Sequence, residues 1–282
     1  MKAPSESFIL KKADNLPSPP FILSELSSMI NRSDAHSHQI ARVIEKDQSF
    51  SARILRLVNS SFYGFARKIV SIDEAITMLG INTIYQLLIT TSVFQAFKSK
   101  QCSARIKKFW HHSFSVGVIA RNLYPGASAD TKSELLLSGV LHDIGRIALL
   151  KMYPEKFCEF YFESDECIDL NSETDTFGIN HQVIGELLAE KWNFPLSLRM
   201  AISHHHLPLS AKSHKKYAAA IHVADIFSHG LQLGGGSHIQ LPSFFPQTWS
   251  LLKINPDKLK EVLVRSIQEF EKEKVLIDSL NA

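Results

Sequence analysis

The sequence predicts an all-α protein in which an N-terminal helical bundle packs on a second helical domain. Apolar residues recur at helical spacing along almost the whole chain. Helix-capping patterns stand between these stretches, and no convincing run of alternating apolar and polar residues indicates a strand. Of the 282 residues, 45% are hydrophobic and 21% are charged, which is typical of a globular protein and excludes disorder, collagen and coiled coil.

The first helices are expected after residue 20, because the prolines at 17, 19 and 20 forbid a helix before Phe21. Three apolar stripes at helical spacing then follow in order: Leu23, Leu26 and Ile30; Ile40, Val43 and Ile44; and Ile54, Leu55 and Val58. Each stripe predicts one helix of the N-terminal bundle.

Capping residues predict further helix ends. Ser71-x-x-Glu74 is a capping box that opens a helix, Gly80 closes that helix, and Asn82 is placed to cap the next one. A second capping box, Thr131-x-x-Glu134, predicts a later helix start.

Charge and cysteine content restrict the partners and the compartment. The net charge of +3 is too small to indicate nucleic acid, so nucleic-acid binding is not expected. The three scattered cysteines, with no C-x-x-C, favour a reducing compartment over a disulfide framework. No signal peptide is evident and no apolar run reaches membrane-spanning length, so we expect a cytoplasmic protein without membrane contact.

One apolar segment carries two polar side chains in its middle. The chain from Leu135 to Leu150 is apolar almost all round, which predicts a central buried helix. His142 and Asp143 lie in this segment, and burying them without partners would cost several kcal/mol. A metal ion would satisfy both side chains at once, and a plain hydrogen bond between them is the alternative.

Four further helical segments present the same kinds of side chain on apolar faces. These side chains are His112, His181 after its N-cap Asn180, His205 with His204 before it, and Asp225. Each one alone would be an ordinary core residue with a hydrogen-bond partner, but together they indicate a metal centre. Imidazole nitrogen and carboxylate oxygen suit Mn, Fe, Zn or Mg, so we expect one or two divalent ions. Asp143 or Asp225 could bridge two ions roughly 3.5–4 Å apart.

These motifs resemble those of the HDOD family, the HD-related output domains of bacterial signalling proteins, within the HD superfamily of metal-dependent phosphohydrolases. The resemblance covers about residues 15–230 and is carried by the stretches 16–20, 54–64, 71–80, 109–113 and 139–146, with Gly185 to Leu188, Trp192 and Pro195. By motif position, it implies the metal ligands His112, His142, Asp143, His181, His204, His205 and Asp225. His111 is the weaker choice at the first position, because the family pattern places the ligand directly before the serine.

The resemblance also implies a domain organisation. We expect an HDOD domain over residues 15–212, with the N-terminal bundle at 15–103 and an HD-like metal-site region at 104–230. A C-terminal helical extension is expected over residues 231–282. The polar stretch from Lys98 to Lys107 and the run Gly234-Gly235-Gly236 mark the candidate boundaries.

Three hypotheses for function remain open. The first is a signalling module with protein partners in a signalling pathway, because HDOD domains are generally regulatory. The second is a metal-dependent phosphohydrolase for a nucleotide or other phosphate ester, with Asp143 as candidate catalytic residue and Arg146 as candidate phosphate contact. The third is a scaffold whose buried histidines only form hydrogen bonds.

Smaller differences from related enzymes and the remaining histidines refine these expectations. HD-GYP enzymes carry a lysine at the position of Arg146 and a Gly-Tyr-Pro motif that is missing here, so cyclic di-GMP hydrolysis is not expected. His206 and His214 are expected to flank a loop. His222, three residues before Asp225, is expected to pack or to orient a ligand carboxylate.

Overall fold

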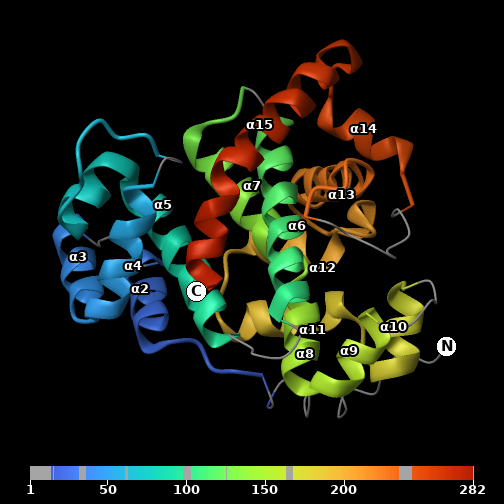
Figure 1. Cartoon of the computed structure of the whole chain (residues 1–282), viewed down its shortest axis with the longest axis horizontal. Coiled ribbons are helices and arrows are strands. Elements are labelled where there is room, and N and C mark those ends of the chain that lie inside the picture. The colour runs from blue at the N-terminus through green and yellow to red at the C-terminus, as the bar shows by residue number, and fades with distance from the viewer. Residues whose placement is uncertain are drawn as a thin grey trace.

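The structure, a computed structural model, describes residue 14 and residues 16–31, 36–60, 63–97, 103–124, 126–162, 168–234 and 243–281. Within these ranges every regular element is a helix and no strand occurs, which confirms the all-α prediction (Figure 1). The N-terminal bundle consists of α2 (Phe21–Asn31), α3 (Ser37–Glu45), α4 (Gln48–Val58) and α5 (Ile72–Ala96).

The helices of the larger part follow in chain order. They are α6 (Ser103–Asn122), α7 (Ala129–Leu141), α8 (Ile144–Met152), α9 (Pro154–Phe162), α10 (Leu170–Phe177), α11 (His181–Lys191), α12 (Leu196–His204), the 3-10 helix η1 (Pro208–Ser210), α13 (Lys215–Gly230), α14 (Pro246–Leu252) and α15 (Pro256–Asn281). The N-terminal bundle lies at one side of the molecule, and α5 joins it to α7 (Figure 1).

Capping explains where several helices begin. Ser71 Oγ accepts the Glu74 backbone N–H at 3.1 Å, which confirms the predicted start of α5. The capping box predicted at Thr131 is wrong, because the N-cap of α7 is Ser128, three residues earlier. Ser128 Oγ accepts the Thr131 N–H at 3.2 Å, so Thr131 lies in the first turn.

Helix α5 is interrupted where the sequence predicts a helix end. Gly80 has a φ of 81° inside α5, a value that glycine adopts without strain, and helical chain continues directly after it. By length and composition α5 is apolar enough to cross a membrane, with a mean hydropathy of 1.3. We had expected no apolar run of membrane-spanning length. Since 56% of that window is buried inside the protein, α5 has the burial of a core helix.

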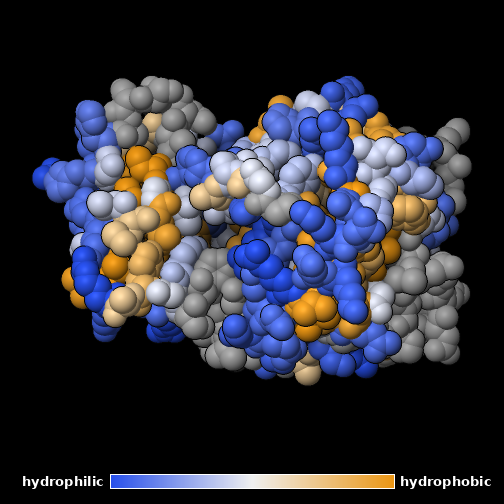
Figure 2. All heavy atoms as spheres, turned by 90° about the horizontal axis from the view of Figure 1, so that it is seen from above, coloured by the Kyte–Doolittle hydropathy of each residue, from blue (hydrophilic) through white to orange (hydrophobic). Residues whose placement is uncertain are grey.

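The hydrophobic core is continuous between the N-terminal bundle and the larger part. One buried cluster extends from Leu16 through α5 and α8 to Phe270 on α15, and a second, smaller one joins α6, α12 and α13. The face seen in Figure 2 is mostly hydrophilic, with apolar atoms gathered on the side of the N-terminal bundle and in patches of the larger part.

The cysteines correct one expectation. Cys158 on α9 is disulfide-bonded, whereas the scattered spacing of the three cysteines argued against disulfides. Spacing along the chain does not show which cysteines a fold brings together, and the compartment inferred from it stays a prediction.

Candidate metal centre

His142 and Asp143 lie between two helices. Helix α7 ends at Leu141 and α8 begins at Ile144, so His142 is the C-cap of α7 and Asp143 the N-cap of α8. The apolar run correctly indicated burial, since the two side chains are 1% and 2% exposed. The prediction of one continuous helix is wrong, because an apolar run does not show where a helix ends. The Asp143 carboxylate makes no capping bond and faces a set of histidines instead.

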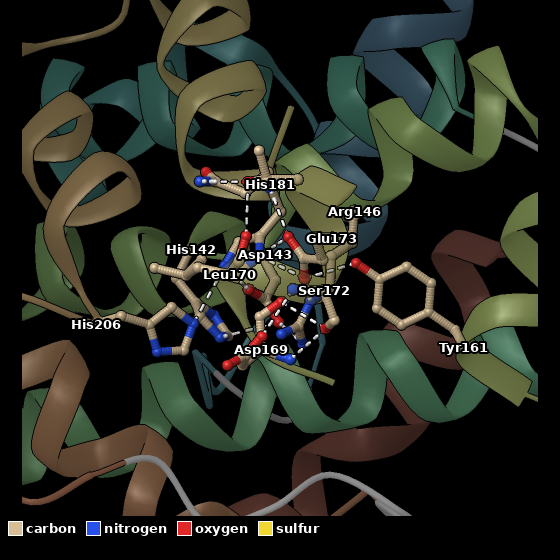
Figure 3. Close-up of polar contacts among 12 residues, drawn as sticks. His142, Asp143, Arg146, Tyr161, Asp169, Leu170, Ser172, Glu173, His181 and His206 are labelled. Carbon is tan, nitrogen blue, oxygen red and sulfur yellow. Dashed lines mark hydrogen bonds and ion pairs between the residues drawn. The ribbon is translucent and has the colours of Figure 1, made fainter. Parts of the chain in front are cut away.

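Two imidazoles contact one oxygen of Asp143, and a third lies beside them; His181, His206 and Asp143 are labelled in Figure 3. Asp143 Oδ1 lies 3.3 Å from His181 Nε2 and 3.4 Å from His205 Nε2. His206 Nε2 lies 3.2 Å from His181 Nε2. One ligand atom from each of these four residues lies within 4.8 Å of the other three, and we call the four residues the Asp143 group.

A second set surrounds Asp225 on α13. Asp225 Oδ1 lies 3.0 Å from His112 Nε2 and 3.3 Å from His229 Nε2. His142 Nε2 lies 3.8 Å from the same oxygen and 3.5 Å from Asp143 Oδ2, so it stands between the two carboxylates. We call His112, His142, Asp225 and His229 the Asp225 group.

Outer partners orient four of these rings. Each ring has its Nδ1 within hydrogen-bond distance of an oxygen on the outside of the cluster, so its Nε2 faces inward. The pairs are His112 with Ser228 Oγ at 3.0 Å, His142 with Gly139 O at 2.7 Å, His181 with Glu173 Oε2 at 2.7 Å and His205 with Ile202 O at 2.9 Å. A carbonyl or an ionised carboxylate only accepts, so Nδ1 carries the proton in at least three of the rings. In a neutral ring Nε2 is then a free lone pair, as a metal ligand requires.

The converging atoms are electrostatically unsatisfied by the protein alone. His181 Nε2 and His205 Nε2 lie 3.2 Å apart, and in two neutral rings that donate from Nδ1 neither nitrogen has a proton to share. Among the described residues, His112 Nε2, His142 Nε2, Asp143 Oδ1 and Asp225 Oδ1 are buried without a hydrogen bond of good geometry, although His112 Nε2 lies 3.0 Å from Asp225 Oδ1. Lone pairs and carboxylate oxygens that face one another in a buried site are costly unless a cation lies among them. The residues therefore fit a divalent metal.

The pKa values support neutral ligands. Burial lowers the pKa of His142 to about 4, against the opposing attraction of Asp143 and Asp225. Burial likewise lowers the pKa of His229 to about 4. Both imidazoles are then unprotonated at neutral pH, which is the form that binds metals.

Arg146 holds the second oxygen of Asp143 (Figure 3). Its Nη1 lies 2.6 Å from Asp143 Oδ2, and its Nε lies 3.5 Å from Glu173 Oε1. Burial would raise the pKa of Asp143, but Arg146 and the neighbouring histidines hold it well below its usual range. The guanidinium is itself buried and already paired with two carboxylates, so contact with a phosphate stays a prediction.

Glu173 on α10 is a buried residue that sequence reasoning missed. Its carboxylate accepts the Tyr161 hydroxyl at 2.7 Å and the His181 backbone N–H at 2.7 Å, besides His181 Nδ1. Burial would raise the pKa of Glu173, but His181 and Arg146 lower it to about 2. Nothing in the polar sequence of α10 distinguishes this glutamate from a solvated one.

The structure brings together most of the predicted ligands. Six of the seven lie in the two groups: His112, His142, Asp143, His181, His205 and Asp225. His204 lies in neither group, and its role as a ligand stays a prediction. It ends helix α12, and its Nδ1 lies 2.7 Å from Ser203 Oγ.

Two histidines of the groups were not predicted as ligands. His206, expected to flank a loop, lies in the Asp143 group beside His205. His229 was missed, although it lies one helical turn after Asp225 and so shares its face. His222 donates from Nδ1 to the His205 carbonyl at 2.8 Å, so it contacts the backbone of a candidate ligand and not a ligand carboxylate.

Comparisons with known proteins agree with the helical fold. The HDOD domain model matches residues 16–208. A structure from Shewanella amazonensis SB2B, named "Putative phosphohydrolase", is 25% identical to this chain and superimposes with a TM-score of 0.75. The alignment covers 97% of this chain and 98% of the Shewanella chain. A structure from Marinobacter aquaeolei VT8, whose name describes a signal transduction protein, is 19% identical to this chain and has a TM-score of 0.72. The alignment covers 100% of this chain and 62% of the Marinobacter chain.

A relative in sequence has no described role. An uncharacterized protein of Treponema pallidum is 24% identical over 222 residues, which are 77% of this chain. The chain spans only 43% of the length of that protein.

The helical fold and the adjacent His142 and Asp143, facing further histidines and a second aspartate, define a domain of the HD type. Within that class, the chain belongs to the HDOD domain family.

Proposed function

We propose that the protein is a signal-transduction module of the HDOD family that holds divalent metal between Asp143 and Asp225 as a resident cofactor. One observation carries the proposal: inward-facing imidazole nitrogens converge on two buried carboxylates, and several of these atoms have no hydrogen-bond partner among the described residues. The names of the Shewanella and Marinobacter proteins support the class in general terms.

Each group would hold one ion. The Asp143 group offers three imidazole nitrogens and one carboxylate oxygen, and the Asp225 group offers the same set. Such a donor set suits Mn, Fe or Zn, while Mg prefers more oxygen. An ion in either group would act as a Lewis acid towards a phosphate oxygen and would lower the pKa of a bound water. The chain's own contribution is to hold the rings in place and to keep the surroundings dry.

Burial favours a regulatory role over turnover. Six of the eight residues in the two groups are at most 6% exposed. A metal in such surroundings contributes its binding energy to the folded state, so it would stabilise the domain in one arrangement that a partner can recognise. We propose a protein partner in a signalling pathway, in the cytoplasm of a bacterium, and no role for nucleic acid or a membrane.

A phosphohydrolase is the second candidate. The pair of adjacent metal groups favours it, because two ions can hold both the attacking and the leaving oxygen of a phosphate ester. The substrate would then be a nucleotide or another phosphate ester. Arg146 would have to leave Asp143 or to contact the substrate with a nitrogen that Asp143 and Glu173 do not use.

The experiment that separates these functions combines metal content with turnover. The protein is purified without an affinity tag or chelator, and metal content, melting temperature and hydrolysis of bis-p-nitrophenyl phosphate are measured before and after chelation. The regulatory proposal expects bound metal, a melting temperature that falls on chelation, and no turnover. Turnover that tracks the bound metal would establish the second candidate instead.

A further inference from the structure

Two buried serines connect the ring of His112 with the end of helix α13. Ser228 Oγ lies 3.0 Å from His112 Nδ1, and Ser115 Oγ lies within hydrogen-bond distance of Ser228 Oγ. Ser115 Oγ also lies 2.8 Å from the backbone carbonyl of His112, about one helical turn earlier on α6. Both serines are 0% exposed. The contacts therefore begin and end at the same histidine, shielded from solvent, and we call Ser115 and Ser228 the serine relay.

The turn after α13 holds Ser228 in this place. The Leu233 backbone N–H donates to the Ser228 carbonyl at 3.0 Å. Gly234 follows with a φ of 90°, and a Cβ there would overlap the backbone nitrogen of His112. The glycine therefore lets the turn close on α6, which brings Ser228 to the ring of His112.

The number of protons available gives a direction to each bond of the relay. A carbonyl only accepts, so the bond between Ser115 Oγ and the His112 carbonyl takes the Ser115 proton. The Ser228 proton then goes to Ser115 Oγ, the nearer of its two acceptors, since the Leu233 carbonyl lies 3.4 Å away. With either acceptor, Ser228 Oγ faces the ring with a lone pair, and His112 Nδ1 is the donor.

The reverse order of donors is less favourable. Ser115 would then donate to Ser228, and Ser228 to His112 Nδ1, which places the ring proton on Nε2. His112 Nε2 lies 3.0 Å from Asp225 Oδ1 but makes no hydrogen bond of good geometry with any described residue. A proton on that nitrogen would be buried without a well-placed acceptor, which costs free energy. The order in which Nδ1 donates avoids this cost.

We propose that Ser115 and Ser228 are positioning residues that keep the proton of His112 on Nδ1, so that Nε2 faces Asp225 with a free lone pair. Ser115 acts on the ring through Ser228, by taking the proton that Ser228 would otherwise donate to Nδ1. A neutral imidazole binds a metal through its unprotonated nitrogen, so the relay prepares His112 as a ligand of the Asp225 group. Only this consequence rests on the proposed function, because the position of the proton needs no metal.

NMR of metal-free protein with isotopically labelled histidine locates the proton, because protonated and unprotonated ring nitrogens differ widely in chemical shift. The spectra are recorded at a pH where the ring is neutral, and the His112 signals are assigned by their loss in His112→Gln. We expect the proton on Nδ1 in the wild type. In Ser115→Ala and in Ser228→Ala the ratio of the Nε2 form to the Nδ1 form should rise about tenfold, the usual weight of one hydrogen bond.

Ser113→Ala is the matched control. Ser113 lies on the same helix, is also 0% exposed, and its Oγ has no hydrogen-bond partner among the described residues. This variant should keep the wild-type proton position. A wild-type proton on Nε2, or one proton position shared by the wild type, Ser115→Ala and Ser228→Ala, overturns the proposal. So does a shift in Ser113→Ala equal to that in Ser115→Ala.

Metal titration with a competing chelator tests the consequence for the Asp225 group. Ser228→Ala should bind metal about 10–100-fold more weakly than the wild type, and Ser113→Ala should bind it equally well. Equal affinity in Ser228→Ala and the wild type would show that the relay does not prepare a ligand. Wild-type protein that keeps the proton on Nδ1 but binds no metal would contradict the proposed function and leave the relay standing, so the two failures are distinguishable.

Discussion

The rings of His181 and His205 place two nitrogen lone pairs 3.2 Å apart in a buried site. Their Nδ1 atoms face Glu173 and the Ile202 carbonyl, so the inward lone pairs are a consequence of hydrogen bonds made on the outside. This pair of rings is the strongest evidence for a metal ion, because only a cation or an added proton relieves the repulsion between the two lone pairs.

Adjacent histidines on α12 and in the turn after it provide a matched test. His205→Ala removes a ring of the Asp143 group and should lower bound metal and abolish the rise in melting temperature on adding metal. His204→Ala removes a ring that contacts Ser203 and should bind metal as the wild type does. Elemental analysis and thermal unfolding measure both. Loss of metal in His204→Ala with retention in His205→Ala would reverse the assignment.

Glu173 is a positioning residue for His181. Glu173→Gln keeps the shape of the side chain but replaces a charged acceptor of His181 Nδ1 with a neutral one. We expect metal affinity to fall about 10–100-fold, as is typical when an outer partner of a ligand histidine is changed. Metal titration with a competing chelator measures the change, and Glu155→Gln, at an exposed position of α9, is the control. An unchanged affinity would show that Glu173 does not position the ring.

At the scale of elements, the metal centre depends on a close approach of two helices. Gly145 on α8 lies against the backbone of His181 and Gly185 on α11, and a Cβ at Gly145 would overlap the His181 carbonyl oxygen. Asp143 and His181 can lie side by side only because α8 and α11 cross at these glycines.

Gly145→Ala should therefore separate α8 from α11. We expect a loss of about 1–3 kcal/mol or more in the free energy of unfolding, the usual cost of overpacking, together with weaker metal binding. Denaturant unfolding and metal titration check both effects. Gly126→Ala is the control, because a Cβ there meets no atom within 4 Å. Wild-type stability of Gly145→Ala would contradict the close approach.

Helix α15 is fixed to α6 by a charged contact with a defined pH dependence. Burial would raise the pKa of Glu269, but bonds from Arg265, Asn122 and Arg121 lower it to about 2, below its ordinary 4.5. Because the folded-state pKa is depressed, the stabilisation is complete above about pH 4.5 and is lost as pH falls towards 2.

Glu269→Gln should consequently destabilise the protein at pH 7 and have progressively less effect as the pH falls from about 4.5 towards 2. Thermal unfolding of the wild type and the variant across this range measures the difference. A difference that stays constant with pH would show that the contact acts through shape and not through charge.

Sequence patterns predicted some elements better than others. The periodic stripes and the Ser71 cap predicted α2 to α5, because one apolar face and one cap are local properties. The break between α7 and α8 was missed, since an apolar run looks the same on either side of a helix end. His229 could have been found from its spacing to Asp225. Glu173 could not, because its role comes from the packing of α10 against α11.

At the scale of the molecule, one continuous core joins the N-terminal bundle to the metal-site region. The family model covers residues 16–208 and so includes both parts. A change at the seam between α5 and α7 would therefore act on the same core that holds His142 and Asp143. The expected boundaries at residues 103, 212 and 231 stay predictions.

Metal stoichiometry is the measurement that tests the central claim most directly. Untagged protein is reconstituted with Mn, Fe or Zn near neutral pH and its metal content is determined beside that of Asp143→Ala. We expect one or two ions per chain in the wild type and their loss in the variant. No bound metal in folded wild-type protein under any of these conditions would contradict the account and would leave the histidines as hydrogen-bonded core residues.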